Sequence, residues 1–557
     1  MAIKLRHTSR YKEIVVALVR HGFGYMVEEM GLFHVLSLPR KWLHRGAEKT
    51  PHTFAERIRL VIEELGPTFI KLGQLSATRQ DLLAPELVKE LQKLQDQVPA
   101  FSMEEVKAIL EEELHTPMNE IFSEFRETPL AAASIGQVHY ARLHSGERVA
   151  VKVQRPHVDK IIELDLDILH DLAALAERRI GWFERYRVRT IIEELSRSMR
   201  EELNYTREGK NTDRIAAQFL QHPGVRIPKI YWPYTTSKVL TMEYLDGLML
   251  NQADELIERG HNLKVTAERL VNAMFHQVLI EGFFHADPHP GNVMVLTDGK
   301  IAFVDFGLVG RLDETMKFHL GSLIIGLMRK DSDAIIHAIS QLGLLTDDVD
   351  MASLRQDLDE MREHYYDIPL SQVSLGEAMN EMFAVANRHR VLIPTDLTLL
   401  GKAMITVEGV AVRLYPELSL VDLAEPYGRR LFKERYHPDK VRQRWWRQAT
   451  EFVETLAGFP RQAAQLTKLL RTGKLKVEIG LPEIDLLLRK LDQISNRISV
   501  SIVLLSFSII MVGLIIASSV GNVPALILHF PVIEVGSTVA GLMFLWLLYS
   551  IFKSGRF

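Results

Sequence analysis

Cysteine is absent from this chain of 557 residues. That absence excludes a disulfide, a thiol nucleophile and a thiolate metal site. Strong charge of one sign is also lacking, because the formal net charge is -4, whereas wholesale nucleic-acid binding requires a strongly basic face. The sequence therefore predicts no nucleic-acid partner, and its length predicts two or more folded units.

Charge is missing from two long stretches near the C-terminus. Residues 498–520 carry no charged side chain, and residues 531–552 carry only Glu534. Each stretch matches the roughly 20 residues that cross a bilayer, although two buried core helices are an alternative. Lys and Arg lie outside both stretches and are absent from 521–530, which predicts that both ends are cytoplasmic.

These stretches predict a transmembrane hairpin at 498–557, contact with membrane lipids and a catalytic domain in the cytoplasm. Small residues one helical turn apart on each span permit either packing within one hairpin or a homodimer. The preceding residues 436–497 predict an amphipathic helical linker that either lies against lipid headgroups or is exposed to solvent.

The first 50 residues predict a basic helical segment. Lys4, Arg6, Arg10 and Lys12 precede a short apolar run at residues 14–19. Such a helix could lie on an anionic membrane surface, or it could pack on the next domain.

The most informative stretch reads His-Ala-Asp-Pro-His-Pro-Gly-Asn at residues 285–292, followed by Asp-Phe-Gly at 305–307. This spacing is typical of a kinase catalytic loop. The apolar residues that follow Asn292 and precede Asp305 predict a short hairpin that turns at Asp298 and Gly299. Phosphoryl transfer needs a carboxylate beside the attacking hydroxyl, together with an amide oxygen and a second carboxylate on metal. Asp287 fits the first role, and Asn292 and Asp305 fit the two metal roles. His285 and His289 could suggest a metal pair, but no further ligands cluster near them in the sequence.

Residues 148–153 alternate like a half-buried strand and carry Lys152, where kinases hold the α and β phosphates. Such a lysine needs a helix carboxylate to orient it. A polar helical stretch beginning near Ile191 offers Glu208, and Glu201 or Glu202 could be the partner instead. Three polar residues of this stretch are expected on one helical face: Asn204, Glu208 and Asn211.

Two further segments predict contacts with a nucleotide. A buried strand at 239–242 leads into Glu243 and Leu245, which is typical of an adenine-binding hinge. The phosphate loop is rich in alanine where a glycine-rich run is usual, and alanine side chains keep the backbone from closing freely on a triphosphate. A plain helix start is the alternative. The predicted loop contacts are Ala131, Ala132, Ala133, Ser134, Ile135 and Gly136.

In these motifs the sequence resembles the UbiB family of atypical kinases, which support ubiquinone and related isoprenoid-quinone biosynthesis. The alanine-rich loop, Lys152, Asp287, Asn292 and Asp305 carry the resemblance. It implies an α+β, bilobal protein-kinase-like fold with Lys152, Glu208 and Asp287 in catalysis, and with ATP or ADP and Mg²⁺ as cofactors. The expected parts are a helical extension at 51–115, an N-lobe at 116–245 and a helical C-lobe at 246–435.

The same resemblance gives a meaning to Lys-Leu-Gly-Gln at residues 71–74, which lie on a helix expected to start at Pro67. In the family, this extension folds over the active site, and its lysine and glutamine meet an acidic pair on the lobe helix. Lys71 and Gln74 match the first two residues. The pair here reads Glu202 and Asn204, which leaves Glu202 as the expected partner of Lys71. All four residues are therefore predicted to be regulatory.

No Ala-Pro-Glu element follows Gly307 closely, so the usual peptide-docking platform is not expected. The leading interpretation is a magnesium-dependent ATPase or small-molecule kinase that couples nucleotide turnover to the handling of isoprenoid lipids, with an isoprenoid lipid precursor as partner, or to a membrane biosynthetic complex. Two alternatives stay open: phosphorylation of a lipid or soluble metabolite, and a nucleotide-gated scaffold without turnover. Transport ranks last because two spans offer no evident pathway.

Overall fold

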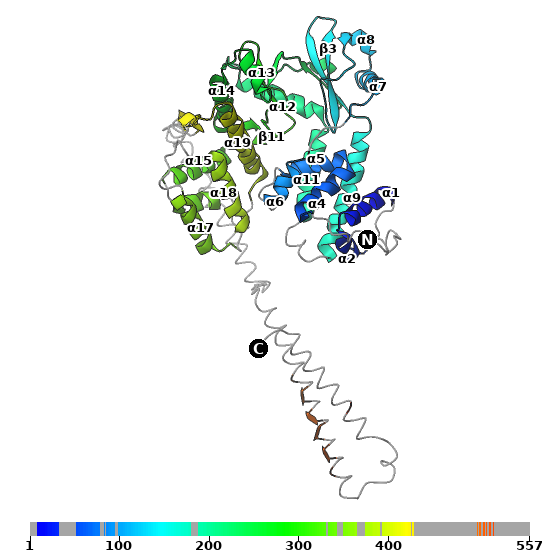
Figure 1. The fold of residues 1–557 in the computed structure, drawn as a ribbon, viewed down its shortest axis with the longest axis vertical. Helices are drawn as coiled ribbons and strands as arrows, with labels where there is room; N and C mark the ends of the chain where they lie inside the picture. Colours follow the sequence, from blue (N-terminus) through cyan, green and yellow to red (C-terminus); the bar gives the residue numbers. More distant parts are fainter. Residues whose placement is uncertain are drawn as a thin grey trace, which may run out of the picture. The chain divides into compact units, whose positions relative to one another are not determined.

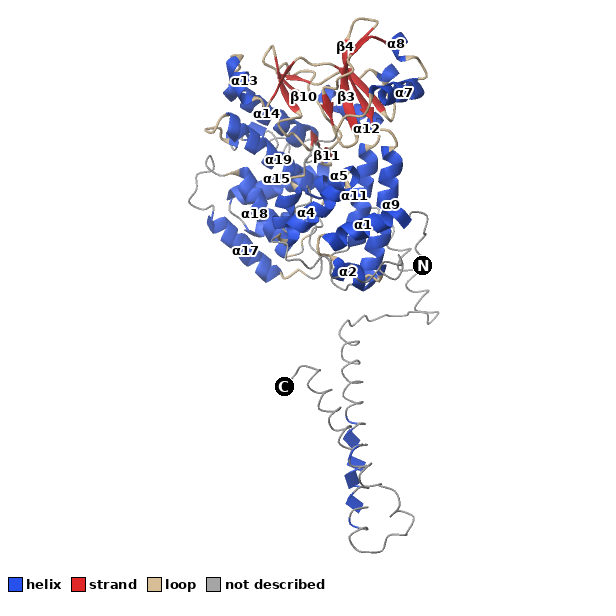
Figure 2. Ribbon diagram, turned by 45° about the vertical axis from the view of Figure 1, so that its right-hand side comes forward, coloured by secondary structure: helices blue, strands red, loops and turns tan. Residues whose placement is uncertain are grey.

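The computed structural model describes residues 8–32, 52–77, 85–94, 99–179, 188–329, 332–341, 349–364, 374–389 and 393–420, with isolated positions besides. The chain divides into two compact units, Met1–Arg442 and Gln443–Phe557. The helices and strands named below belong to the first unit (Figure 1). Within that unit, the strands gather at one end and helices make up most of the remainder (Figure 2).

The N-terminal extension consists of helices that pack against two helices from later in the chain, α9 (Val158–Arg179) and α11 (Val188–Glu202). A shared core buries Ile14 and Val15 of the first helix with Ile168 and Ala176 of α9. The extension helices are α1 (Thr8–Arg20), α2 (Gly24–Glu29), α4 (Phe54–Leu65), α5 (Pro67–Ala77) and α6 (Pro85–Leu91).

The N-lobe is built on a sheet in which β1, β3, β4 and β6 are antiparallel neighbours and β2 pairs with β3. Side chains alternate between the two faces of a strand. Val149, Val151 and Val153 therefore face α7 (Met103–Leu114) in one core, while Lys152 faces the opposite side. The strands are β1 (Phe122–Phe125), β2 (Ala131–Ala132), β3 (Gly136–Leu143), β4 (Arg148–Gln154) and β6 (Val239–Glu243).

The C-lobe combines helices with two small sheets. One sheet has the order β5-β10-β9-β7, and the other pairs β8 with β11. The largest core of the described residues lies here, and α14 (Leu263–Phe275) and α19 (Thr395–Leu414) pack together in it. The strands are β5 (Val225–Arg226), β7 (Gly247–Met249), β8 (Phe283–His285), β9 (Val293–Leu296), β10 (Ile301–Phe303) and β11 (Val309–Arg311).

Short elements complete the two lobes. They are α8 (Met118–Ile121), α12 (Tyr205–Gln218), η3 (Trp232–Tyr234), α13 (Ala253–Glu258) and the π-helical turn η4 (His276–Glu281). A further helical layer continues from β11 and has its own small core around Leu354, Leu358 and Val385. Its helices are α15 (Glu314–Arg329), α16 (Ser332–Gln341), α17 (Met351–His364) and α18 (Leu375–Arg388).

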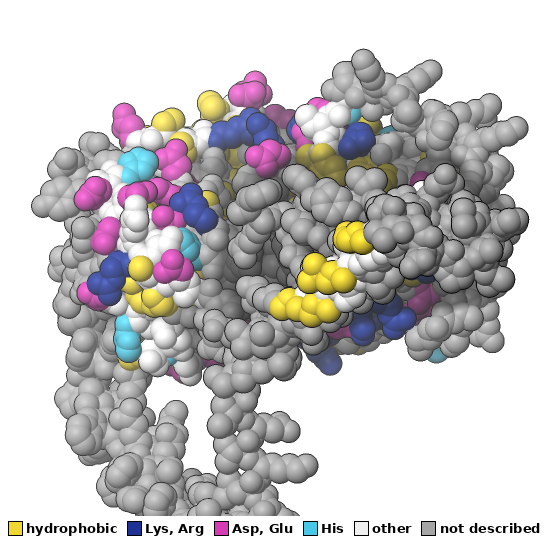
Figure 3. Space-filling model, turned by 90° about the horizontal axis from the view of Figure 1, so that it is seen from below, with side chains coloured by type: hydrophobic (Ala, Val, Ile, Leu, Met, Phe, Trp, Pro, Cys, Tyr) yellow, Lys and Arg dark blue, Asp and Glu magenta, His cyan; other side chains and the backbone are white. Residues whose placement is uncertain are grey.

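The predicted membrane spans fall outside the described residues, apart from isolated positions between 498 and 538. Among the described residues, no helix has both the length and the apolar character that crossing a bilayer would require. Seen from below, the described side chains include Lys and Arg interspersed with Asp and Glu (Figure 3).

Several local predictions are confirmed. The helix that starts at Pro67, the strand at 148–153 and the strand at 239–242 are all present. So is the hairpin that turns at Asp298 and Gly299, where Gly299 has φ +79°. The N-terminal apolar run is buried against α9. Its apolar side chains therefore contact the protein, as required if this helix packs on the next domain.

One expectation needs correction. The single helical stretch predicted from Ile191 is broken at Leu203 and Asn204, so Asn204 does not share a helical face with Glu208. The alternative of a helix start at Ala131 is not found, because Ala131–Ala132 form strand β2. Helix α7, which falls within the segment 51–115 expected as the extension, packs on the N-lobe sheet.

The ion pair between Arg10 and Asp165 gives a stability prediction. Arg10 Nε and Nη2 donate to the two Asp165 oxygens over 2.8 and 3.1 Å, and the Asp165 side chain is fully buried. Arg10→Ala leaves that carboxylate unpaired, which should cost about 3 kcal/mol. We expect a lower free energy of unfolding and faster hydrogen exchange in α1. Arg20→Ala is the control because Arg20 is 62% exposed in its pair with Glu64. Equal effects of the two substitutions would contradict the prediction.

Candidate active site

The site is organised around the ammonium group of Lys152, which lies between two carboxylates. Its Nζ is 2.9 Å from both oxygens of Glu208 and 3.3 Å from Oδ2 of Asp305. The three residues come from β4, from α12 and from the segment just after β10. Lys152 and Glu208 are 15% and 6% exposed, whereas Asp305 is 41% exposed. The cluster thus joins the two lobes and leaves one carboxylate open to a ligand.

Charge in this cluster is shared unequally. Burial opposes the charge of Lys152, but Asp305 and Glu208 hold the pKa of Lys152 well above its usual value. Desolvation also opposes ionisation of Asp305, yet Lys152 and the N–H of Gly307 hold the pKa of Asp305 well below its usual value. Burial raises the pKa of Glu208 to about 7, against the attraction of Lys152. The single ammonium group therefore keeps the Asp305 carboxylate ionised, whereas Glu208 ionises only near neutral pH.

The catalytic-loop residues follow β8. The Asn292 amide nitrogen donates to the backbone oxygen of Asp287 over 3.2 Å, which sets the loop conformation. His289 Nδ1 accepts from the Gly291 N–H over 3.0 Å. Lys402 Nζ of α19 lies 2.8 Å from Oδ1 of Asp287. Desolvation raises the pKa of Asp287, but Lys402 outweighs this effect and keeps the pKa below its usual value.

His285 is part of the core below this loop. Its ring lies against Phe303 and Phe306, with centroid distances of 5.8 and 5.4 Å. Burial lowers the pKa of His285, which favours the neutral ring. Among the described residues, no three His, Asp or Glu side chains are grouped as metal ligands. Asn292 and Asp305 nevertheless offer an amide and a carboxylate oxygen, the donor types that Mg²⁺ prefers.

The alanine-rich loop is a tight turn between β2 and β3. The Ala133 N–H donates to the Gly136 oxygen over 2.8 Å. A Cβ atom at Gly136 would lie 2.4 Å from the Tyr205 hydroxyl and 2.6 Å from the Val153 oxygen, so only glycine fits there. Ile135 is buried with residues of α5, α9 and α11. The loop is therefore fixed from one side by the extension.

The side chains of the predicted hinge residues, Glu243 and Leu245, make contacts within the protein. The Glu243 carboxylate accepts from Arg226 over 2.7 and 2.9 Å and from the Lys229 N–H over 3.2 Å. A nucleotide base could therefore meet Glu243 only through its backbone. Leu245 packs on an apolar cluster of the C-lobe sheet that includes Met294 and Ala302.

The extension reaches this region through Lys71, which forms an ion pair with Glu202. Gln74 donates to the Leu94 oxygen over 3.3 Å. The Asn204 side chain accepts from the Thr206 N–H over 3.1 Å and begins α12. Of the four predicted regulatory residues, the structure therefore brings Lys71 and Glu202 together, while Gln74 contacts Leu94 and Asn204 caps α12.

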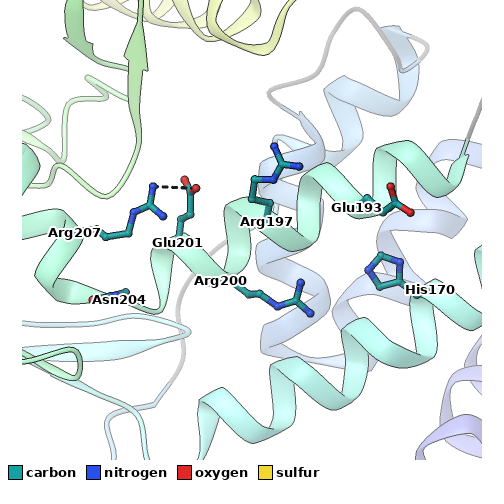
Figure 4. A pocket seen from close by; sticks show the side chains of 7 residues that line it. All are labelled: His170, Glu193, Arg197, Arg200, Glu201, Asn204 and Arg207. Atoms are coloured by element: carbon teal, nitrogen blue, oxygen red, sulfur yellow. Dashed lines mark ion pairs between the residues drawn. The ribbon is translucent and has the colours of Figure 1, made fainter.

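A separate cavity of about 440 Å³ lies along α11 (Figure 4). It contains Asn204 but none of Lys152, Asp287, Asn292 and Asp305. Two of its arginines already have carboxylate partners, since Arg200 binds Glu163 and Arg207 binds Glu201. Its lining residues are His170, Glu193, Arg197, Arg200, Glu201, Asn204 and Arg207.

Sequence reasoning missed two residues that contact the predicted site. Tyr205 is fully buried, and the Lys152 ammonium lies 5.1 Å from the centre of its ring. Lys402 lies on α19, whose apolar periodicity by itself indicates only core packing. The one available signal for Lys402 is that residues 284–292 contain no Lys or Arg, so a cation for the catalytic loop has to come from elsewhere.

Three family models match the chain in succession. They describe an ABC1 atypical kinase-like domain at residues 93–339, a UbiB helical domain at 358–419 and an ABC1/UbiB kinase-like C-terminal domain at 482–553. The chain belongs to the ABC1/UbiB family. This assignment confirms the family predicted from the motifs and a mixed helix-and-sheet, kinase-like fold.

Relatives of this ABC1/UbiB chain are similar along most of its length. An uncharacterized protein of Synechocystis is 34% identical over 81% of this chain and 79% of its own. A protein from the hydrogenase 1 5' region of Clostridium pasteurianum is 30% identical over 98% and 99%. "Protein ACTIVITY OF BC1 COMPLEX KINASE 7, chloroplastic" of Arabidopsis thaliana is 37% identical over 78% of this chain and 64% of its own. A solved Mycobacterium tuberculosis structure with erythromycin aligns with a TM-score of 0.47, at 24% identity, over 63% and 86% of the two chains.

The raised pKa of Glu208 gives a pH prediction. Folded Glu208 keeps its proton up to about pH 7, whereas an unfolded glutamate loses it near pH ~4.3. The stability that neutral Glu208 contributes is therefore complete below that value and is lost as pH rises through about 7. The slope is at most about 1.4 kcal/mol per pH unit. Glu208→Gln cannot titrate, so the stability of wild type relative to this variant should fall from pH 5 to 7.

Urea unfolding at each pH measures this difference. Glu201→Gln is the control, because Glu201 is 42% exposed in its pair with Arg207, and this variant should follow the wild-type curve. Parallel curves for wild type and Glu208→Gln would show that Glu208 is already ionised at pH 5.

Proposed function

We propose that this ABC1/UbiB chain is a membrane-anchored ATPase or phosphotransferase that binds ATP and a divalent metal and supports isoprenoid-quinone lipid biosynthesis. The observation that carries the proposal is the position of Lys152, held at 2.9 Å from Glu208 and 3.3 Å from Asp305. A lysine oriented by a helix carboxylate beside a metal-binding aspartate is the arrangement that phosphoryl transfer requires.

Apolar residues of both lobes support a site for the nucleotide base. Ala150 and Met242 are opposite each other on neighbouring strands, on the same face of the sheet as Lys152. Leu245 and Met294 belong to the apolar cluster of the C-lobe. A base between these surfaces would lead its phosphates to Lys152, with the alanine-rich turn above them.

The metal would be held by Asn292 and Asp305. Asp305 stays ionised at neutral pH, because its pKa lies well below the usual value, and its 41% exposed side chain can reach a ligand. When bound, Mg²⁺ neutralises charge on the phosphate oxygens. Asp287 remains to orient an acceptor hydroxyl or water, and its backbone oxygen is held by Asn292.

The membrane part of the proposal rests on the second unit. Residues 498–520 carry no charged side chain and residues 531–552 carry only Glu534, and each stretch is long enough to cross a bilayer. The isoprenoid-quinone part rests on the family resemblance, and the name of the Arabidopsis relative refers to the BC1 complex and a kinase.

Nucleotide binding and hydrolysis by the purified full chain test the enzyme proposal. Asp305→Asn should weaken Mg²⁺-dependent ATP binding by about tenfold or more, because a carboxylate ligand is lost. Chelation of Mg²⁺ should reduce binding to wild type and leave the variant unchanged. Lys152→Ala should weaken ATP binding with or without metal. Unchanged hydrolysis by Asp305→Asn would contradict the assignment of Asp305 as a metal ligand.

The lipid role is tested separately. Hydrolysis by wild type should rise when vesicles containing isoprenoid lipid precursors are added, and a deletion strain should have altered isoprenoid-quinone levels. Labelled phosphate on a lipid or metabolite would identify a kinase. Complementation of the deletion by Asp287→Asn would instead indicate a nucleotide-gated scaffold.

A further inference from the structure

We propose that Lys402, from the helical domain, is a catalytic residue that contacts the terminal phosphoryl group of the bound nucleotide. This inference rests on the proposed function. Its starting point is the 2.8 Å contact between Lys402 Nζ and Asp287 Oδ1. The Lys402 side chain is 26% exposed, so it borders the site and is not enclosed in the core.

The catalytic loop cannot provide such a cation itself. Residues 284–292 contain neither Lys nor Arg. His289 accepts a hydrogen bond at Nδ1 from the Gly291 N–H, so that nitrogen cannot donate to a phosphoryl oxygen. Lys152 is expected to hold the α and β phosphates. Charge that develops on the terminal phosphoryl oxygens requires a nearby positive group, and among the described residues Lys402 forms an ion pair with the loop.

The fold holds Lys402 in a defined position. The Arg311 N–H of β11 donates to Asp396 in the first turn of α19 over 2.8 Å. β11 in turn pairs with β8, the strand that leads into Asp287. Leu399, Ala403 and other residues on one face of α19 are buried in the C-lobe core. The helix is thus fixed at its start and along one side, which directs Lys402 to the loop.

The Asp287 contact explains how the ammonium group is held before a nucleotide arrives. Lys402 and Asp287 form an ion pair, and their side chains are 26% and 31% exposed. An ammonium group has three donors. The Asp287 oxygen uses one of them, so Lys402 can contact a phosphoryl oxygen and the aspartate together. The pair would thereby bring the phosphoryl group and the acceptor-orienting carboxylate side by side.

Comparison of ATP with ADP isolates the terminal phosphoryl group. With purified full chain and Mg²⁺, Lys402→Met should weaken ATP binding about tenfold and ADP binding less than about twofold, because one charge-assisted contact to the terminal phosphate is lost. Methionine retains the apolar stem of the side chain. Lys402→Arg, which keeps the charge, should largely restore ATP affinity. Lys264→Met is the control, because Lys264 lies on α14 over the Tyr415 ring, and this variant should bind both nucleotides normally.

A second background separates direct contact from action through Asp287. In Asp287→Ala, addition of Lys402→Met should still weaken ATP more than ADP. Loss of this selectivity, equal weakening of both nucleotides, or no weakening would overturn the assignment. A thermal unfolding midpoint close to that of wild type excludes misfolding of Lys402→Met. Failure of wild type to bind either nucleotide would refute the proposed function itself. Normal ATP binding by Lys402→Met would refute only the role of Lys402.

Discussion

The buried ammonium group of Lys152 is the constraint on which the arrangement of the two lobes depends. A charge on the inner face of β4 is costly to bury unless carboxylates lie within a few ångströms. Glu208 comes from α12 and Asp305 from the C-lobe, so pairing this one charge brings three elements together. The alternation of β4 makes this possible, because its valines fill the opposite core and leave Lys152 on the inner face between Ala150 and Gln154.

The break between α11 and α12 lets neighbouring acids serve two different lysines. Glu202 ends α11 and pairs with Lys71 of the extension, whereas Glu208 on α12 pairs with Lys152. Asn204 supplies the cap that starts the second helix. An uninterrupted helix would separate these acids by nearly two turns along one axis. Because the helix breaks at Asn204, Lys71 of the extension and Lys152 of the sheet bind different carboxylates.

Local sequence patterns sufficed for the features that depend on near neighbours in the chain. The alternation at 148–153 and the turn at Asp298 and Gly299 predict strands and a hairpin that are present. The break at Asn204 was not predicted, because no proline or glycine marks it and the polar periodicity continues across it. Lys402 was missed for a different reason. Its contact with Asp287 depends on the packing of α19, and helical periodicity alone indicates only which residues of α19 are buried.

The position of α19 bears on where the kinase-like unit ends. The ABC1 kinase-like match covers residues 93–339, and the UbiB helical match covers 358–419. Asp287 belongs to the first segment and its counter-ion Lys402 to the second. The same helix also supports α18, since the Glu408 carboxylate accepts from the Ser374 hydroxyl over 3.2 Å and from the Gly376 N–H. A chain that ended at 339 would leave Asp287 without this partner and the C-lobe core without α19. The helical segment therefore supplies a side chain that contacts Asp287 of the kinase-like segment.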